Sequence, residues 1–180
     1  MPSWAVVVVI AVFIIGAAAV WWTMSRRRTQ HLRTRFGPEY ERTISEAGNQ
    51  RVAEADLARR EKRVERFNIR PLGPQDREHF VEAWHGCQSR FVDDPNGAVA
   101  EADRLVSEVM KARGYPMVDF EQRLDDISVD HPHVVQNYRA AFAIARRQER
   151  GEATKEDLRK AVMYYRDLFD DLLEMHEVRR

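Results

Sequence analysis

The sequence is poor in cysteine and has no charged residue in its first 25 positions. Cys87 is the one cysteine among 180 residues. A single cysteine excludes an internal disulfide framework and is consistent with a reducing compartment. Nowhere do apolar and polar residues alternate for long enough to predict a β-strand. A Gly-rich phosphate loop, a nucleophile elbow and a paired-cysteine metal signature are also missing. These absences predict an all-α protein without a catalytic motif.

The most prominent feature is one long apolar run, from Trp4 to Trp22. A hydrocarbon core of ~30 Å needs about 20 apolar residues at ~1.5 Å of helical rise each, and the run is about that long. Tryptophans stand at both ends, Trp4 at one and Trp21 with Trp22 at the other, where aromatic rings favour the headgroup region. The run predicts a transmembrane anchor in residues 1–25, with the lipid bilayer as its partner.

The orientation of this anchor is predicted by the arginines that follow it. Arg26, Arg27 and Arg28 come directly after the span, and no Lys or Arg precedes it. Positive residues near a span stay on the cytoplasmic side, so we expect a single-pass protein of the cell membrane with its body in the cytoplasm. The alternative is a cleaved signal peptide with an exported body, for which Ala17-Ala18-Ala19 would supply the cleavage site.

A basic juxtamembrane segment and a stalk helix are predicted for residues 26–70. This segment holds thirteen basic and seven acidic residues, whereas residues 71–180 hold sixteen and twenty-two. From Glu39 to about Arg66 the chain is rich in helix formers and poor in apolar residues, which predicts one charged stalk helix. The apolar pattern does not sustain heptads, so only weak pairing with a second copy is left open. Nucleic-acid binding is not expected, because no aromatic residues are interleaved with the positive charges.

Residues 71–180 are predicted to form a bundle of four or five helices. Pro71, Gly73 and Pro74 separate it from the stalk. The first helix has an apolar stripe at helical spacing, made of Phe80, Trp84, Cys87 and Phe91. Four later segments repeat the helical pattern, and their predicted caps are Asp94, Asp130 and Thr154, with stops at Gly114 and Gly151.

Four phrases of the sequence resemble those of a known family. They are Arg35-Phe36-Gly37-Pro38-Glu39-Tyr40, Phe91-Val92-Asp93-Asp94-Pro95, Arg113-Gly114-Tyr115-Pro116 and Ser128-Val129-Asp130-His131-Pro132. In this order they are similar to a bacterial family, frequent in actinobacteria, of uncharacterised small single-pass membrane proteins. The resemblance implies the architecture described above and brings no activity, ligand or catalytic residue with it.

Several residues of metal-binding or nucleophilic type need an interpretation. His85, Cys87, His131 and His133 could be arranged as two ligand pairs, but residues two apart on a helix point about 200° apart. We interpret Asp130 as a helix cap and the histidines beside it as surface residues. Cys87 belongs to the apolar stripe, where a cysteine usually acts as a small hydrophobe rather than a nucleophile.

Three acidic pairs are interpreted structurally as well. They are Asp93-Asp94, in which Asp94 caps a helix, and Asp125-Asp126 and Asp170-Asp171, both taken as solvated helix faces. No catalytic, cofactor-binding or metal residue is therefore predicted, and no cofactor. The predicted function is a membrane-anchored interaction or scaffold module with protein partners. The alternative is a helical sensor or enzyme whose pocket lies between helices.

Overall fold

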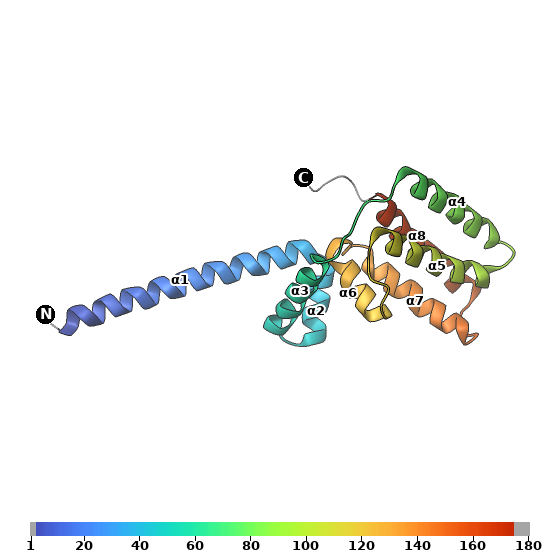
Figure 1. Cartoon of the computed structure of the whole chain (residues 1–180). Coiled ribbons are helices and arrows are strands. Elements are labelled where there is room, and N and C mark those ends of the chain that lie inside the picture. The colour runs from blue at the N-terminus through green and yellow to red at the C-terminus, as the bar shows by residue number, and fades with distance from the viewer. Residues whose placement is uncertain (1–2, 175–180) are drawn as a thin grey trace. The chain divides into compact units, whose positions relative to one another are not determined.

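Eight helices and no strand make up the described part of the protein. The computed structural model describes the backbone of residues 3–174, and the side chains of that range apart from residues 3–12, 14, 18 and 174. The helices, shown in Figure 1, are α1 (Ser3–Phe36), α2 (Pro38–Ala47), α3 (Gln50–Val64), α4 (Pro74–Arg90), α5 (Pro95–Arg113), α6 (Phe120–Asp130), α7 (Val135–Glu149) and α8 (Lys155–Glu174). The all-α prediction is confirmed.

The chain divides into two compact units, Met1–Leu57 and Ala58–Arg180. The first contains α1, α2 and the beginning of α3, and the second contains the end of α3 and all of α4 to α8. The predicted segments 1–25, 26–70 and 71–180 stay predictions.

In the first unit, α1 is one uninterrupted helix of 34 residues. Among the helices of the described residues, none meets the length and apolarity that crossing a bilayer requires. The predicted span Trp4–Trp22 falls in part on residues 3–12, whose side chains lie outside the described residues. The helix ends at Gly37, whose positive φ of 48° lets the chain turn, and Pro38 opens α2 at once.

The predicted stalk helix is wrong in one respect, because it is two helices rather than one. Gly48 ends α2 in the left-handed conformation, with φ 62°, and its amide donates to the carbonyl of Ile44 at 2.9 Å. Asn49 then begins α3, since its side-chain oxygen accepts the amides of Arg51 at 2.8 Å and Val52 at 3.3 Å. Glycine followed by asparagine is a helix stop followed by a helix start.

In the second unit, α4 to α8 form a helical bundle, which agrees with the predicted four or five helices. Figure 1 shows α5 and α8 between α4 and α7, and α8 packs against both α5 and α7. The apolar stripe of α4 is confirmed: Phe80, Trp84 and Cys87 are buried, and Trp84 stacks on Phe169 of α8 with ring centroids 4.6 Å apart. Phe91, at the end of the stripe, is partly buried.

Helix caps set both ends of α5 and the start of α8. Asp94 accepts the amide of Gly97 at 2.9 Å and opens α5, which ends at Gly114 with φ 97°. Thr154 and Asp157 form a reciprocal capping box at α8, with distances of 3.1 and 3.0 Å. These predicted caps are confirmed. Asp130 is different, and is treated with its neighbours below.

Candidate functional site

The membrane-facing candidate begins with exposed apolar side chains on α1. The large apolar side chains that the structure describes between positions 13 and 24 are all more than half exposed to solvent, from 52% for Trp22 to 75% for Phe13. They are Phe13, Ile15, Val20, Trp21, Trp22 and Met24. Large apolar side chains in such a run leave a patch that needs an apolar partner.

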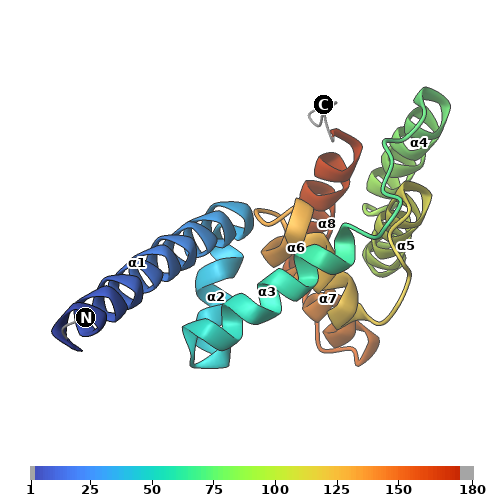
Figure 2. The ribbon, with the colours of Figure 1, turned by 60° about the vertical axis from the view of Figure 1, so that its left-hand side comes forward.

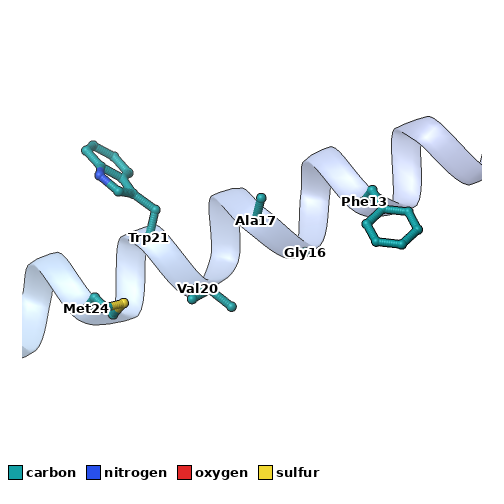
Figure 3. A pocket seen from close by; sticks show the side chains of 6 residues that line it. All are labelled: Phe13, Gly16, Ala17, Val20, Trp21 and Met24. Carbon is teal, nitrogen blue, oxygen red and sulfur yellow. The ribbon is translucent and has the colours of Figure 1, made fainter.

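Six residues along this part of α1 line a shallow hollow, shown in Figure 3. They are Phe13, Gly16, Ala17, Val20, Trp21 and Met24. Gly16 faces open space, because an added Cβ there would meet no atom within 4 Å. All six residues belong to one helix, so the hollow is an open stretch of apolar surface rather than an enclosed pocket.

The predicted topology residues lie directly after this apolar surface on the same helix. The guanidinium carbon of Arg26 lies 3.7 Å from the centroid of the Trp22 ring, a close cation–π contact. Arg27 and Arg28 follow and are exposed. Of the predicted anchor residues, Trp21, Trp22 and the three arginines are therefore exposed within two turns of one helix, while the side chain of Trp4 lies outside the described residues.

A partly buried polar hub fixes the end of α1 to α2 and α3. Oε1 of Glu54 in α3 accepts the hydroxyl of Thr29 in α1 at 2.8 Å and that of Tyr40 in α2 at 2.9 Å. The side-chain amide of Gln50 donates to the same oxygen at 2.8 Å. One carboxylate oxygen thus joins three helices immediately after the arginine cluster.

The ionisation of this hub favours a charged Glu54. Burial alone would raise the pKa of Glu54, but the hydrogen bonds from Gln50, Thr29 and Tyr40 and the nearby charge of Arg28 outweigh it, so the pKa is lowered. Burial, followed by the bond to Glu54, raises the pKa of Tyr40 to about 12. Tyr40 is therefore a neutral donor and Glu54 a charged acceptor at neutral pH.

A second polar cluster lies in the bundle, where the ends of α5, α6 and α8 meet. Nη1 of Arg113 donates to the carbonyl of Leu172 at 2.7 Å, and both residues are buried. Nδ1 of His131 contacts one carboxylate oxygen of Asp171, and Nε2 of His133 lies 2.9 Å from the other. The hydroxyl of Tyr115 donates to Asp130 at 3.2 Å, and those two residues complete the cluster.

The pKa values of Arg113 and Asp171 in this cluster are both shifted, by burial and by their contacts. Burial lowers the pKa of Arg113, and Tyr115, Asp130 and Asp171 partly offset that effect. Burial would raise the pKa of Asp171, but its contacts with His131 and His133 outweigh it, and the net pKa is lowered. The arrangement holds the last turns of α8 against the α6–α7 connection.

The prediction that Asp130 caps the following helix is wrong. Asp130 is the last residue of α6, and α7 begins only at Val135, with Val134 at its N-cap and no side-chain cap bond. Asp130 instead accepts from Tyr115. His131 is also not a surface residue, since it is 1% exposed, whereas His133 is exposed as expected.

Two acidic pairs do not form the solvated faces that were predicted. Asp126 is buried and accepts from Nε of Arg63 at 2.7 Å, and Asp125 pairs with Arg60 at 2.7 Å. Figure 2 shows α6 beside the final turns of α3, which carry these two arginines. Asp171 pairs with histidines, as described above, so only its neighbour Asp170 has the predicted exposed helical pair, with Arg166.

The interpretation of Cys87 as a small buried hydrophobe agrees with its surroundings. It is fully buried, and its thiol donates to the carbonyl of Ala98 at 3.2 Å. Burial, with a smaller effect from Glu101, raises the pKa of the thiol to about 11, which disfavours the nucleophilic thiolate. His85, two residues earlier on α4, is exposed. In the described range, no three His, Cys, Asp or Glu side chains are arranged to hold a metal ion.

Sequence reasoning missed both polar clusters because their members are far apart in the chain. Glu54 lies 25 residues from Thr29, and Asp171 lies 40 residues from His131. No local spacing signals either contact.

Comparison with known proteins gave no match to a protein family, a curated protein or a solved structure. The resemblance to the actinobacterial family stays a prediction.

Proposed function

We propose that the protein is a single-pass membrane protein whose helical body serves as an interaction or scaffold module on the cytoplasmic side. The observation that carries this proposal is the uninterrupted α1. Its described side chains between positions 13 and 24 include large, exposed apolar ones, and Arg26, Arg27 and Arg28 follow without a break in the helix. The order of an apolar run, a tryptophan pair and an arginine cluster is that of a span ending at the cytoplasmic interface.

The contacts that follow the proposed span support a folded base next to the membrane. Glu54 joins α1 to α2 and α3 within a turn of the arginine cluster. These hydrogen bonds hold α2 and the first turns of α3 against the end of α1. The first unit is therefore a short helical base on the membrane.

The charged side chains inside the bundle have structural partners. Arg113 holds the carbonyl of Leu172, Asp126 holds Arg63, and Asp171 holds His131. These contacts link helices to one another, which favours a module that acts through its surface. The alternative of a sensor or enzyme gains nothing from the hollow in Figure 3, because the residues lining it all belong to α1.

A reporter fused after Arg180 tests the orientation. We expect a fluorescent protein there to fold and fluoresce, and an alkaline phosphatase, which is active only after export, to remain inactive. A fully active phosphatase fusion would refute the cytoplasmic body. Moving the three arginines to precede Trp4 should raise phosphatase activity by inverting part of the population.

A further inference from the structure

Two of the arginines after the proposed span carry charge that no carboxylate of residues 3–174 neutralises. From Arg26 to Phe36, α1 contains five arginines and no acidic residue. Arg33 is paired with Glu41, and Arg28 lies close enough to Glu54 to lower the pKa of that carboxyl. Within residues 3–174, no carboxylate pairs with the side chain of Arg26 or Arg27.

The nearby acidic residues are already engaged. Glu41 holds Arg33, and Glu39 and Glu46 both hold Arg42. Glu54 is occupied by the hub. An anion that neutralises Arg26 and Arg27 must therefore come from outside the described chain.

The height of these arginines along α1 matches that of lipid phosphates. Arg26 is four residues beyond Trp22, which is ~6 Å along a helix at ~1.5 Å per residue. If Trp21 and Trp22 mark the boundary of the hydrocarbon core, Arg26 and Arg27 lie among the headgroups. Successive helical residues are about 100° apart, so Arg26 to Arg28 cover more than half of the circumference.

The contact with Trp22 prepares Arg26 for an anionic ligand. With its guanidinium carbon 3.7 Å from the ring centroid, one face of the group lies against the indole. Its N–H donors lie in the plane of the guanidinium and point outward from the edge, the geometry that binds two phosphate oxygens at once. The stacked arrangement reduces the freedom that Arg26 would lose on binding.

We propose that Arg26, Arg27 and Arg28, with Arg26 positioned by Trp22, form a binding surface for the phosphates of anionic phospholipids. This inference rests on the membrane anchoring proposed above and adds a lipid class to it. Zwitterionic lipids also carry phosphate, but their choline or ethanolamine group cancels its charge, so the surface should prefer lipids with net negative charge. Each arginine near an anionic surface raises the affinity for that surface about fivefold. This contribution decreases with distance from the surface and is largely lost beyond one Debye length.

The test uses the full chain reconstituted into vesicles that contain brominated lipid. Bromine quenches nearby tryptophan fluorescence, so in a Trp4→Phe background Trp21 and Trp22 report which lipids surround the arginine end of the span. Vesicles of phosphatidylcholine with brominated phosphatidylglycerol are compared with vesicles in which the bromine is on phosphatidylcholine. We expect phosphatidylglycerol to be enriched at least about twofold near the protein, and the enrichment to disappear in ~1 M salt.

The variant carrying Arg26→Gln, Arg27→Gln and Arg28→Gln should show no enrichment. A matched control replaces Arg146, Arg150 and Arg159 by glutamine, which removes the same charge from exposed residues that already have acidic partners. This control should keep the enrichment of the unaltered protein.

The outcomes separate this inference from the anchoring on which it rests. Equal quenching by both lipids in protein that is stably inserted would overturn the lipid preference alone. Equal loss in the test and control variants would also overturn it, by showing that only total charge matters. Protein that is washed off the vesicles at alkaline pH would overturn the anchor and the lipid surface together.

Discussion

The hydroxyl of Tyr40 donates a 2.9 Å hydrogen bond to Oε1 of Glu54, and this bond joins α2 to α3. Thr29 of α1 donates to the same oxygen. Replacing Glu54 by alanine leaves two hydroxyls without their acceptor, which we expect to cost about 1–3 kcal/mol. Hydrogen exchange of the full chain in detergent should speed up in α2 and the first turns of α3.

The control for this prediction is Glu46→Ala. Glu46 is exposed and pairs only with Arg42 on the same helix, so its loss should cost less than about 1 kcal/mol. If both variants exchange at the rate of the unaltered protein, Glu54 does not hold the three helices together.

Gly48 and Gly86 should respond in opposite directions to alanine. An added Cβ meets no atom within 4 Å at either position, so crowding does not distinguish them. Gly48 has a positive φ of 62°, and alanine there should cost about 1–2 kcal/mol in backbone strain. Gly86 lies within α4, where alanine should stabilise by up to ~1 kcal/mol. Denaturant unfolding of the two variants measures the sign directly, and a stabilising Gly48→Ala would contradict the helix break.

Trp84→Ala should strongly destabilise the bundle. The change removes the ring stacked on Phe169 and leaves a cavity, which typically costs about 3–5 kcal/mol. Glu82, two residues earlier on the same helix, is exposed, and Glu82→Ala should be nearly silent. Equal melting temperatures for the two variants would contradict the packing of α4 on α8.

The contact between Asp171 and the two histidines predicts a pH dependence of stability. The pKa of Asp171 is lowered in the folded protein, so the carboxylate contributes stability above its unfolded pKa of about 3.9. That contribution should be lost as the pH falls through the lower folded pKa. Asp171→Asn should destabilise the protein at neutral pH. It should also reduce the loss of unfolding free energy between pH 7 and pH 2, which we call the acid limb.

Asp170→Asn serves as the control for the acid limb. Asp170 is adjacent in sequence but makes only an exposed contact with Arg166, at 3.2 Å. Its replacement should leave the acid limb unchanged. An identical acid limb in both variants would show that the cluster of His131, His133 and Asp171 does not couple protonation to folding.

The sequence predicts the elements of this fold better than the contacts between them. The stripe of Phe80, Trp84 and Cys87 is visible at helical spacing, and the Thr154–Asp157 box is a local pattern. The break at Gly48 was not predicted, because the helix formers around it favour one continuous helix, whereas the structure starts a new helix at Asn49.

The polar clusters could not be predicted in the same way. Asp171 and Asp126 are acidic residues on helices, and their partners lie 40 and 63 residues away in the chain. From sequence alone, acidic residues on helices are expected to face solvent. Which of them become buried depends on how the helices pack, and the sequence pattern does not show that. Asp130 shows the converse error, because a proline two residues later resembled a helix start that the chain delays until Val135.

The most direct test of the account is whether the full chain stays in the membrane fraction after a carbonate wash at about pH 11. Peripheral proteins are released by this wash, whereas a helix inserted through the hydrocarbon core is retained. We expect the unaltered protein to remain in the pellet, and a variant with Val8→Lys and Val12→Lys to be released, because each charge in the middle of a span costs about 2.5–3.5 kcal/mol. Recovery of the unaltered protein in the supernatant would contradict the proposed membrane anchor.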